Sequence, residues 1–183
     1  MGIVTNWIES PRARKLLQKA RALLEDLTPL KTNCGKLCGC ACCANDETGD
    51  NGMLLFPFEN KFYQKPIEGF PFRLLPDNAL YKGGYRLVCE GVCPREQRPL
   101  GCRLFPLRIR LQSNDSGFQT HAVAEIDPRA YAVCPLPEMG GLRAMDPVFV
   151  EAVQKAGELL LKDVYMLEAL GNEQKLLEEM CRL

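Results

Sequence analysis

Cysteines are the residues of this sequence best suited to chemistry, and they are clustered. The chain of 183 residues contains ten of them. Five lie in the window CGKLCGCACC, and four more follow in the middle of the chain: Cys34, Cys38, Cys40, Cys42, Cys43, then Cys89, Cys93, Cys102 and Cys134. A thiol that only packs in a core does not need other cysteines nearby, whereas a metal needs several thiolates that converge on one point. The window therefore predicts a metal site, with enough later cysteines to complete one centre or two.

The spacing of the cysteines favours an iron-sulfur cluster over zinc. Zinc sites typically use paired Cys-x2-Cys knuckles, and this chain has no such pair of knuckles. Three pairs are instead separated by three residues: Cys34 and Cys38, Cys38 and Cys42, Cys89 and Cys93. This looser spacing suits an iron-sulfur cube, whose ligand positions are spread more widely than those of a single ion. The Cys-Pro steps at Cys93 and Cys134 point the same way, because Cys-Pro closes the bacterial ferredoxin motif. Zinc is the alternative.

The adjacent cysteines Cys42 and Cys43 allow a further prediction. Consecutive side chains of an extended backbone point to opposite sides. The two thiols therefore serve two centres, or one centre and one free thiolate, more easily than one tetrahedral ion. A disulfide between neighbouring residues is badly strained, so the cluster indicates metal or redox chemistry rather than a disulfide framework.

Arginines crowd the second group of cysteines. They are Arg95, Arg98, Arg103, Arg108 and Arg110. Four thiolates around zinc or an oxidised 4Fe-4S core leave a net charge of about minus two. Guanidinium groups donate hydrogen bonds to cluster sulfur or to nearby carbonyls, and we expect Arg98 and Arg103 to contact the bound group. The alternatives are a basic strip for an anionic substrate or nucleic acid and, for Arg108 and Arg110, a solvated surface.

A helix before the window and a hairpin after it are predicted to position these residues. Ser10 and Pro11 begin a helix with an apolar face that ends at Thr28-Pro29, directly before the window. Residues 45–141 are rich in glycine, proline and aromatic side chains, which favours short strands such as 53–58 and 85–88. A β-hairpin is predicted, with one strand from Leu107 to Gln112 and the other from Phe118 to Ile126.

The C-terminal part is predicted to be helical. Asp146 and Pro147 begin a long helix that ends at Gly171, and Asn172 begins a last short helix in which Cys181 packs. The single histidine, His121, is expected to have a structural or surface role. Together these elements predict an α+β fold: a small, cysteine-rich and loop-dominated metal-binding core, residues 34–135, with a short β-hairpin, flanked by terminal helices.

One block of the sequence resembles a known family. The stretch Cys93-Pro-Arg-Glu-Gln-Arg98-Pro99-Leu-Gly-Cys102-Arg103-Leu-Phe105-Pro106, after a cluster that ends in a vicinal pair, is similar to the YkgJ-type proteins, described as zinc- or iron-chelating. The similarity covers residues 34–135. It implies ligand roles for Cys34, Cys38, Cys42, Cys43, Cys93 and Cys102, with Cys89 and Cys134 where members often place further cysteines. Cys40 departs from the pattern and can replace Cys42 or Cys43.

The composition of the chain argues against several classes of function. The chain has 23 basic and 23 acidic residues, so no overall field attracts nucleic acid or an anionic membrane. The sequence contains neither an apolar run long enough to span a bilayer nor an export signal at its start, and we expect one cytoplasmic domain over residues 1–183. The leading hypothesis is a 4Fe-4S protein that works in electron transfer or cluster chemistry with a protein partner. A structural zinc module and a thiol-based sulfur or metal carrier are the alternatives.

Overall fold

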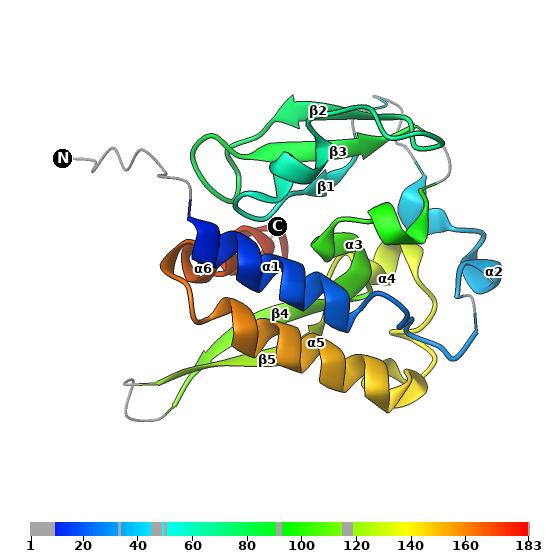
Figure 1. Cartoon of the computed structure of the whole chain (residues 1–183). Coiled ribbons are helices and arrows are strands. Elements are labelled where there is room, and N and C mark those ends of the chain that lie inside the picture. The colour runs from blue at the N-terminus through cyan, green and yellow to red at the C-terminus, as the bar shows by residue number, and fades with distance from the viewer. Residues whose placement is uncertain are drawn as a thin grey trace.

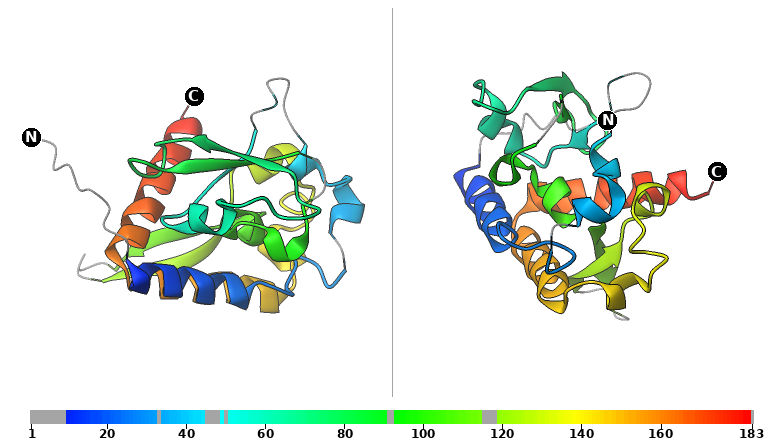
Figure 2. Two further views of the ribbon diagram at one scale, coloured as in Figure 1. Left: turned by 45° about the horizontal axis from the view of Figure 1, so that its top comes forward. Right: turned by 90° about the vertical axis from the view of Figure 1, so that its right-hand side faces the viewer.

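The computed structural model describes residues 10–32, 34–44, 49, 51–90, 93–114 and 119–182. Over these residues, helices and small antiparallel sheets follow one another without a regular alternation (Figure 1), so the fold is α+β, as predicted. Helix α1 and the later helix α5 lie side by side (Figure 2), and the strands form two separate sheets, of which the β4–β5 hairpin packs against α5.

Helix α1, Pro11–Leu23, begins where the sequence predicts, because the Ser10 side chain accepts a hydrogen bond from the Ala13 amide. Ala13 and Leu17 are completely buried. The helix ends about one turn before the predicted Thr28. Further on, the carbonyls of Glu25 and Leu27 accept hydrogen bonds from the Arg95 guanidinium instead of from amides of a continuing helix.

The first sheet has three strands in the order β1-β3-β2: β1 Met53–Leu54, β2 Phe72–Pro76 and β3 Tyr85–Cys89. Strand β3 confirms the predicted strand at 85–88, whereas only the start of 53–58 is a strand. The second sheet is the predicted hairpin, β4 Leu107–Ser113 with β5 Thr120–Ile126, in the register that pairs Leu107 with Ile126. Residues 115–118 of its turn lie outside the described part of the chain. His121 is exposed on β5, as a surface role requires.

The C-terminal helices differ from the prediction. Helix α5, Pro147–Leu160, ends well before Gly171, and α6, Val164–Met180, begins well before Asn172. The Asp163 side chain accepts a hydrogen bond from the Tyr165 amide at 3.0 Å, so it caps a new helix at this point. The break lets α6 turn and pack against β4 instead of continuing along α1. The prediction that Cys181 packs is wrong, because this residue is exposed at the end of α6.

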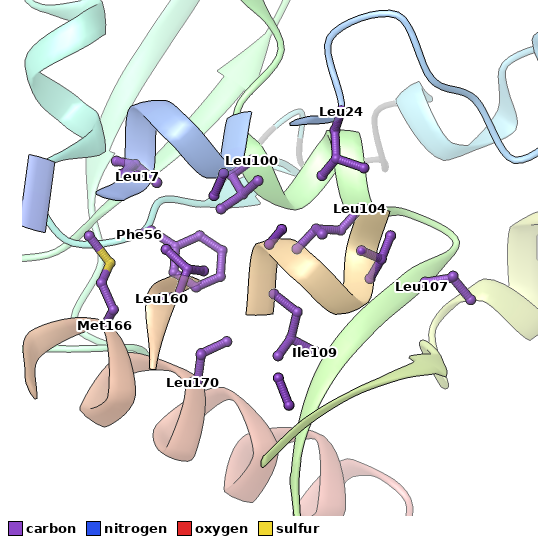
Figure 3. Close-up of a cluster of buried hydrophobic side chains, with 14 of the residues drawn as sticks. Leu17, Leu24, Phe56, Leu100, Leu104, Leu107, Ile109, Leu160, Met166 and Leu170 are labelled. Carbon is purple, nitrogen blue, oxygen red and sulfur yellow. The ribbon is translucent and has the colours of Figure 1, made fainter. Parts of the chain in front are cut away.

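Short helical segments connect these elements, and most of the cysteines lie within them or directly beside them. These segments are α2 Gly35–Cys38, η1 Ala41–Cys43, η2 Glu59–Tyr63, η3 Arg95–Gln97, α3 Leu100–Leu104, α4 Ala130–Val133 and η4 Gly141–Ala144. Helix α3 is central, since it contacts α1, β1 and β4. Its Leu100 and Leu104 enter the main core beside Leu24 and Leu160 (Figure 3). None of the described helices combines the length and the apolar composition needed to cross a bilayer.

Candidate metal centre

Four segments far apart in sequence bring eight cysteines to one end of the molecule. The first segment is α2 with η1, the second runs from the end of β3 to Cys93, the third is α3, and the fourth follows α4 (Figure 1). Helix α4 packs directly against η1. The gathered cysteines are Cys34, Cys38, Cys42, Cys43, Cys89, Cys93, Cys102 and Cys134, and all of them line one or both of two cavities.

The backbone of the CGKLCGCACC window reverses between α2 and η1. Gly39 and Cys40 both have left-handed conformations, with φ of +60° and +59°. This conformation costs glycine little, but it raises the conformational free energy of a residue with a Cβ by about 1–2 kcal/mol. The reversal directs Cys42 and Cys43 toward the cavities and leaves Cys40 exposed, with its Sγ 3.9 Å from the Gly35 carbonyl. Cys40 and Cys43 have the chain's single Cys-x2-Cys spacing, yet Cys40 lines neither cavity.

The larger cavity has a volume of about 220 Å³ and is lined by five cysteines: Cys42, Cys43, Cys89, Cys93 and Cys102. Much of the rest of its wall is formed by Gly52, Met53, Arg98 and Arg129. One water needs only about 10–15 Å³ on this measure. The space therefore accommodates a group of several atoms, which is what a cluster requires.

The smaller cavity has a volume of about 60 Å³. Five cysteines also line it: Cys34, Cys38, Cys42, Cys102 and Cys134. Arg95, Arg98 and Arg103 contribute to its wall, and so does Phe105, which lines both cavities. Cys42, Cys102 and Arg98 also belong to both linings, so the two cavities are neighbours.

Helix α3 fixes the position of Cys102. Leu100 and Leu104 are one helical turn apart and are 0% and 3% exposed, so this face of α3 is held in the core. Cys102 lies between them on the opposite face and points to the cavities. Gly101 allows the Met53 side chain to pack closely against α3, because a Cβ at this position would collide with the Met53 sulfur.

Strand β3 and the segment after it position the next two thiols. Cys89 is the last residue of β3 and pairs with Phe72 of β2. Cys93 belongs to the second hydrophobic cluster, with Leu55, Tyr63, Phe70 and Leu87, and is buried. A hydrogen bond joins the thiols of Cys89 and Cys93.

The thiols of the larger cavity differ in how readily they ionise. The hydrogen bond from Cys42 lowers the pKa of Cys43 to about 6, with a further contribution from Arg98. The hydrogen bond from Cys89 likewise lowers the pKa of Cys93, again with help from Arg98. Burial raises the pKa of Cys102, and the thiolates of Cys93 and Cys43 raise it further. Without a metal, some of the thiols in this cavity ionise readily. Ionisation of all of them requires a bound cation, which offsets the negative charge of the thiolates.

Arg98 provides the observation that tests whether this donor set fits an anionic metal centre. Its guanidinium lies close enough to Cys93 to lower the pKa of that thiol, and its Nε is buried with no hydrogen-bond partner among the described residues. Buried hydrogen-bond donors nearly always have an acceptor, so an unpaired N–H group beside thiols requires an explanation. Several thiolates on a metal would supply negative charge and acceptors at this place. The residues present therefore fit a thiolate-bound metal group.

The other arginines have different partners. Arg103 is buried and donates to three carbonyls, those of Arg98 at 2.9 Å, Arg21 at 3.0 Å and Glu96 at 2.7 Å. These bonds tie α1 to the η3 turn, so Arg103 supports the wall of the smaller cavity.

On the β-hairpin, Arg108 and Arg110 both pair with Glu125, at 2.6 Å and 3.1 Å. Neither of them lines a cavity that contains cysteines.

A buried carboxylate that the sequence did not single out joins the site to α1. Glu59 is completely buried and accepts hydrogen bonds from Arg21 Nη1 at 3.0 Å, the Phe56 amide at 3.2 Å and the Leu100 amide at 2.7 Å. Arg21 also donates to the Tyr63 hydroxyl. The start of α3, and with it Cys102, is therefore tied to α1. The signal was present in part, because Arg21 falls four residues after Leu17 and three before Leu24, on the apolar face.

Within the described ranges, no three cysteine, histidine, aspartate or glutamate side chains converge closely enough to hold a single ion. Comparison with family models, with curated proteins and with solved structures finds no match.

Proposed function

We propose that the chain binds an iron-sulfur cluster, of the 4Fe-4S type, in the larger cavity through Cys43, Cys89, Cys93 and Cys102. The observation that carries the proposal is the gathering of these thiols from three segments around a cavity of about 220 Å³. Three of them sense the charge of at least one other: Cys89 is influenced by Cys93, Cys102 and Cys43, Cys93 by Cys43, and Cys102 by Cys93 and Cys43. They form one set of four, the number of ligands that such a cluster takes.

The volume of the cavity supports a cluster over a single zinc ion. Zinc takes four thiolates at about 2.3 Å and leaves no space between the ion and its ligands. A cube of iron and sulfide keeps its cysteine ligands further apart. A cavity with room for several atoms, walled by thiols, therefore supports the larger group. The resemblance of residues 93–106 to the YkgJ-type family supports metal binding by the same cysteines.

The surroundings also favour an anionic cluster. Arg98 lowers the pKa of the neighbouring Cys93 thiol and has a buried Nε with no hydrogen-bond partner among the described residues. Arg129 lines the same cavity. Guanidinium groups that hydrogen-bond to cluster sulfur stabilise its negative charge and tune its reduction potential. When bound, the cluster would supply one-electron transfer or a reactive iron.

Access to the site supports a role with a partner. Cys43 and its neighbour Cys42 are exposed, whereas Cys93 is buried. One edge of the bound group would therefore face solvent while the rest is held in the protein. We propose electron exchange with a protein partner across this exposed edge.

A pair of cysteine variants tests the proposal. Cys102→Ser is expected to lose the iron and sulfide of this centre, because serine is a poor ligand for iron-sulfur clusters and Cys102 is central to the set. Cys181→Ser is the matched control, since Cys181 is exposed at the end of α6 and lines neither cavity. Both variants are purified anaerobically and checked by circular dichroism. Equal iron and sulfide in the two variants would contradict the assignment.

A further inference from the structure

Four cysteines remain beside the proposed cluster site, and they also lie together. They are Cys34, Cys38, Cys42 and Cys134, and all four line the smaller cavity of about 60 Å³. A set of this kind is unlike a lone buried thiol, because four soft donors from two segments far apart in sequence share one concave wall. Packing alone does not account for such a gathering.

Helix α2 holds the first two thiols on one side. Cys34 is the residue just before α2 and Cys38 its last residue, so they are four positions apart and lie one above the other on the same face. The Cys38 Sγ is 3.9 Å from the Cys34 carbonyl, which keeps the thiol against its own helix. Two ligands four residues apart on a helical turn are an established way to present a pair of donors to one metal.

Cys134 completes the set from another part of the chain. It follows α4, and α4 packs against η1. The Cys34 thiol lies within electrostatic range of both Cys38 and Cys134, and Cys134 lies within range of Cys38. These three thiols are therefore neighbours.

The vicinal pair is divided between the two cavities. Cys42 and Cys43 are consecutive residues of a 3₁₀-helix, in which successive side chains diverge by about 120°. Cys43 lines only the larger cavity, whereas Cys42 also lines the smaller one and is influenced by Cys38. The two Sγ atoms are 3.9 Å apart. Cys42 is therefore placed to complete the second set, while Cys43 belongs to the first.

The geometry points to a second, separate metal centre, in which Cys34, Cys38, Cys42 and Cys134 bind a thiophilic metal in the smaller cavity. Without metal the described thiols do not converge closely enough to hold a single ion, so their side chains must move together when the metal binds. Four thiolates select soft or borderline metals such as zinc and iron. Each thiol that binds releases its proton to solvent. Arg95 and Arg98 line this cavity and offset its negative charge. The inference rests on the proposed function in taking the other four thiols as the ligands of the first centre.

The adjacent cysteines provide the sharpest test. In the full-length chain purified anaerobically, iron, zinc and sulfide per chain are measured for wild type, Cys42→Ser and Cys43→Ser. These two variants change neighbouring, equally exposed thiols, yet we expect each to lose the metal of a different centre and to keep that of the other. Cys134→Ser is expected to match Cys42→Ser, and Cys89→Ser to match Cys43→Ser. Circular dichroism establishes that each variant is folded.

Several outcomes would overturn the second centre. It is wrong if Cys42→Ser and Cys134→Ser contain as much metal as wild type, or if all four variants lose the same metal. Failure of the proposed function looks different: the wild-type chain would then contain zinc but no sulfide. In that case the second centre is still supported if Cys134→Ser removes one zinc of two, and it is overturned if Cys134→Ser removes none or both.

Discussion

Replacement of Glu59 by glutamine tests how strongly the site depends on the fold. The Glu59 carboxylate accepts hydrogen bonds from Arg21 Nη1, the Phe56 amide and the Leu100 amide, and it is completely buried. Glutamine has the same shape but only one acceptor oxygen, and its NH₂ group would face an N–H donor. Glu59→Gln therefore leaves at least one buried donor without a partner and Arg21 without its opposite charge.

The cost follows from these contacts. A hydrogen bond to a charged group contributes about 1.5–3 kcal/mol, and an unsatisfied buried donor costs about 1–3 kcal/mol. Arg21 keeps its hydrogen bond to the Tyr63 hydroxyl and its position 4.8 Å from the Phe62 ring centre, which limits the loss. We expect a total of about 3 kcal/mol. For a chain of this size that lowers the melting temperature by about 6–12 °C.

Thermal unfolding of the metal-free protein at pH 7, followed by circular dichroism, measures the effect. Glu68→Gln is the control, since Glu68 is exposed in the following loop and its replacement should change stability by less than about 0.5 kcal/mol. A double-mutant cycle with Arg21→Met should give a coupling of at least about 1.5 kcal/mol. A melting temperature for Glu59→Gln within 2 °C of that for Glu68→Gln would refute the reasoning, on the scale of about 2–4 °C per kcal/mol.

Three other substitutions test separate features. Asp163→Ala should cost about 1 kcal/mol in urea unfolding, because it removes the cap of α6; an unchanged midpoint would contradict the cap. Gly52→Ala should lower the free energy of unfolding by about 1–3 kcal/mol, because a Cβ would collide with the Leu87 carbonyl. A variant as stable as wild type would show that the cavity wall adjusts to the added Cβ. Burial raises the pKa of Glu173, and the neighbouring Asp127 carboxylate raises it further, which together outweigh the opposing effect of Arg129 at 3.3 Å. The folded state thus favours protonated Glu173, and wild type loses stability as pH rises above about 4.5. Glu173→Gln should remove this loss; a variant markedly less stable than wild type at pH 7 would refute it.

Local signals allowed much of the fold to be predicted. Ser10 and Pro11 start α1, Asp146 and Pro147 start α5, and the alternating residues on either side of 113–119 give the β4–β5 hairpin. The break between α5 and α6 was missed, because the apolar spacing continues across Leu160 and Val164 while Asp163 caps a new helix. There, a single side-chain hydrogen bond outweighed the periodicity.

The site was predicted in composition but not in arrangement. The sequence identified the cysteines and Arg98, because thiols at close spacing need no structure to be noticed. It could not assign them to two cavities, since that depends on the left-handed turn at Gly39 and Cys40 and on the packing of α4 against η1. Glu59 escaped notice because its role comes from partners dozens of residues away.

The central claim is that this chain is an iron-sulfur protein, and one measurement tests it most directly. The wild-type chain is purified without oxygen, and iron, zinc and acid-labile sulfide are quantified in the same sample. We expect a brown protein with iron and sulfide in equal amounts, at about four of each for every occupied 4Fe-4S site. A colourless protein that contains zinc, without iron or sulfide, would contradict the account.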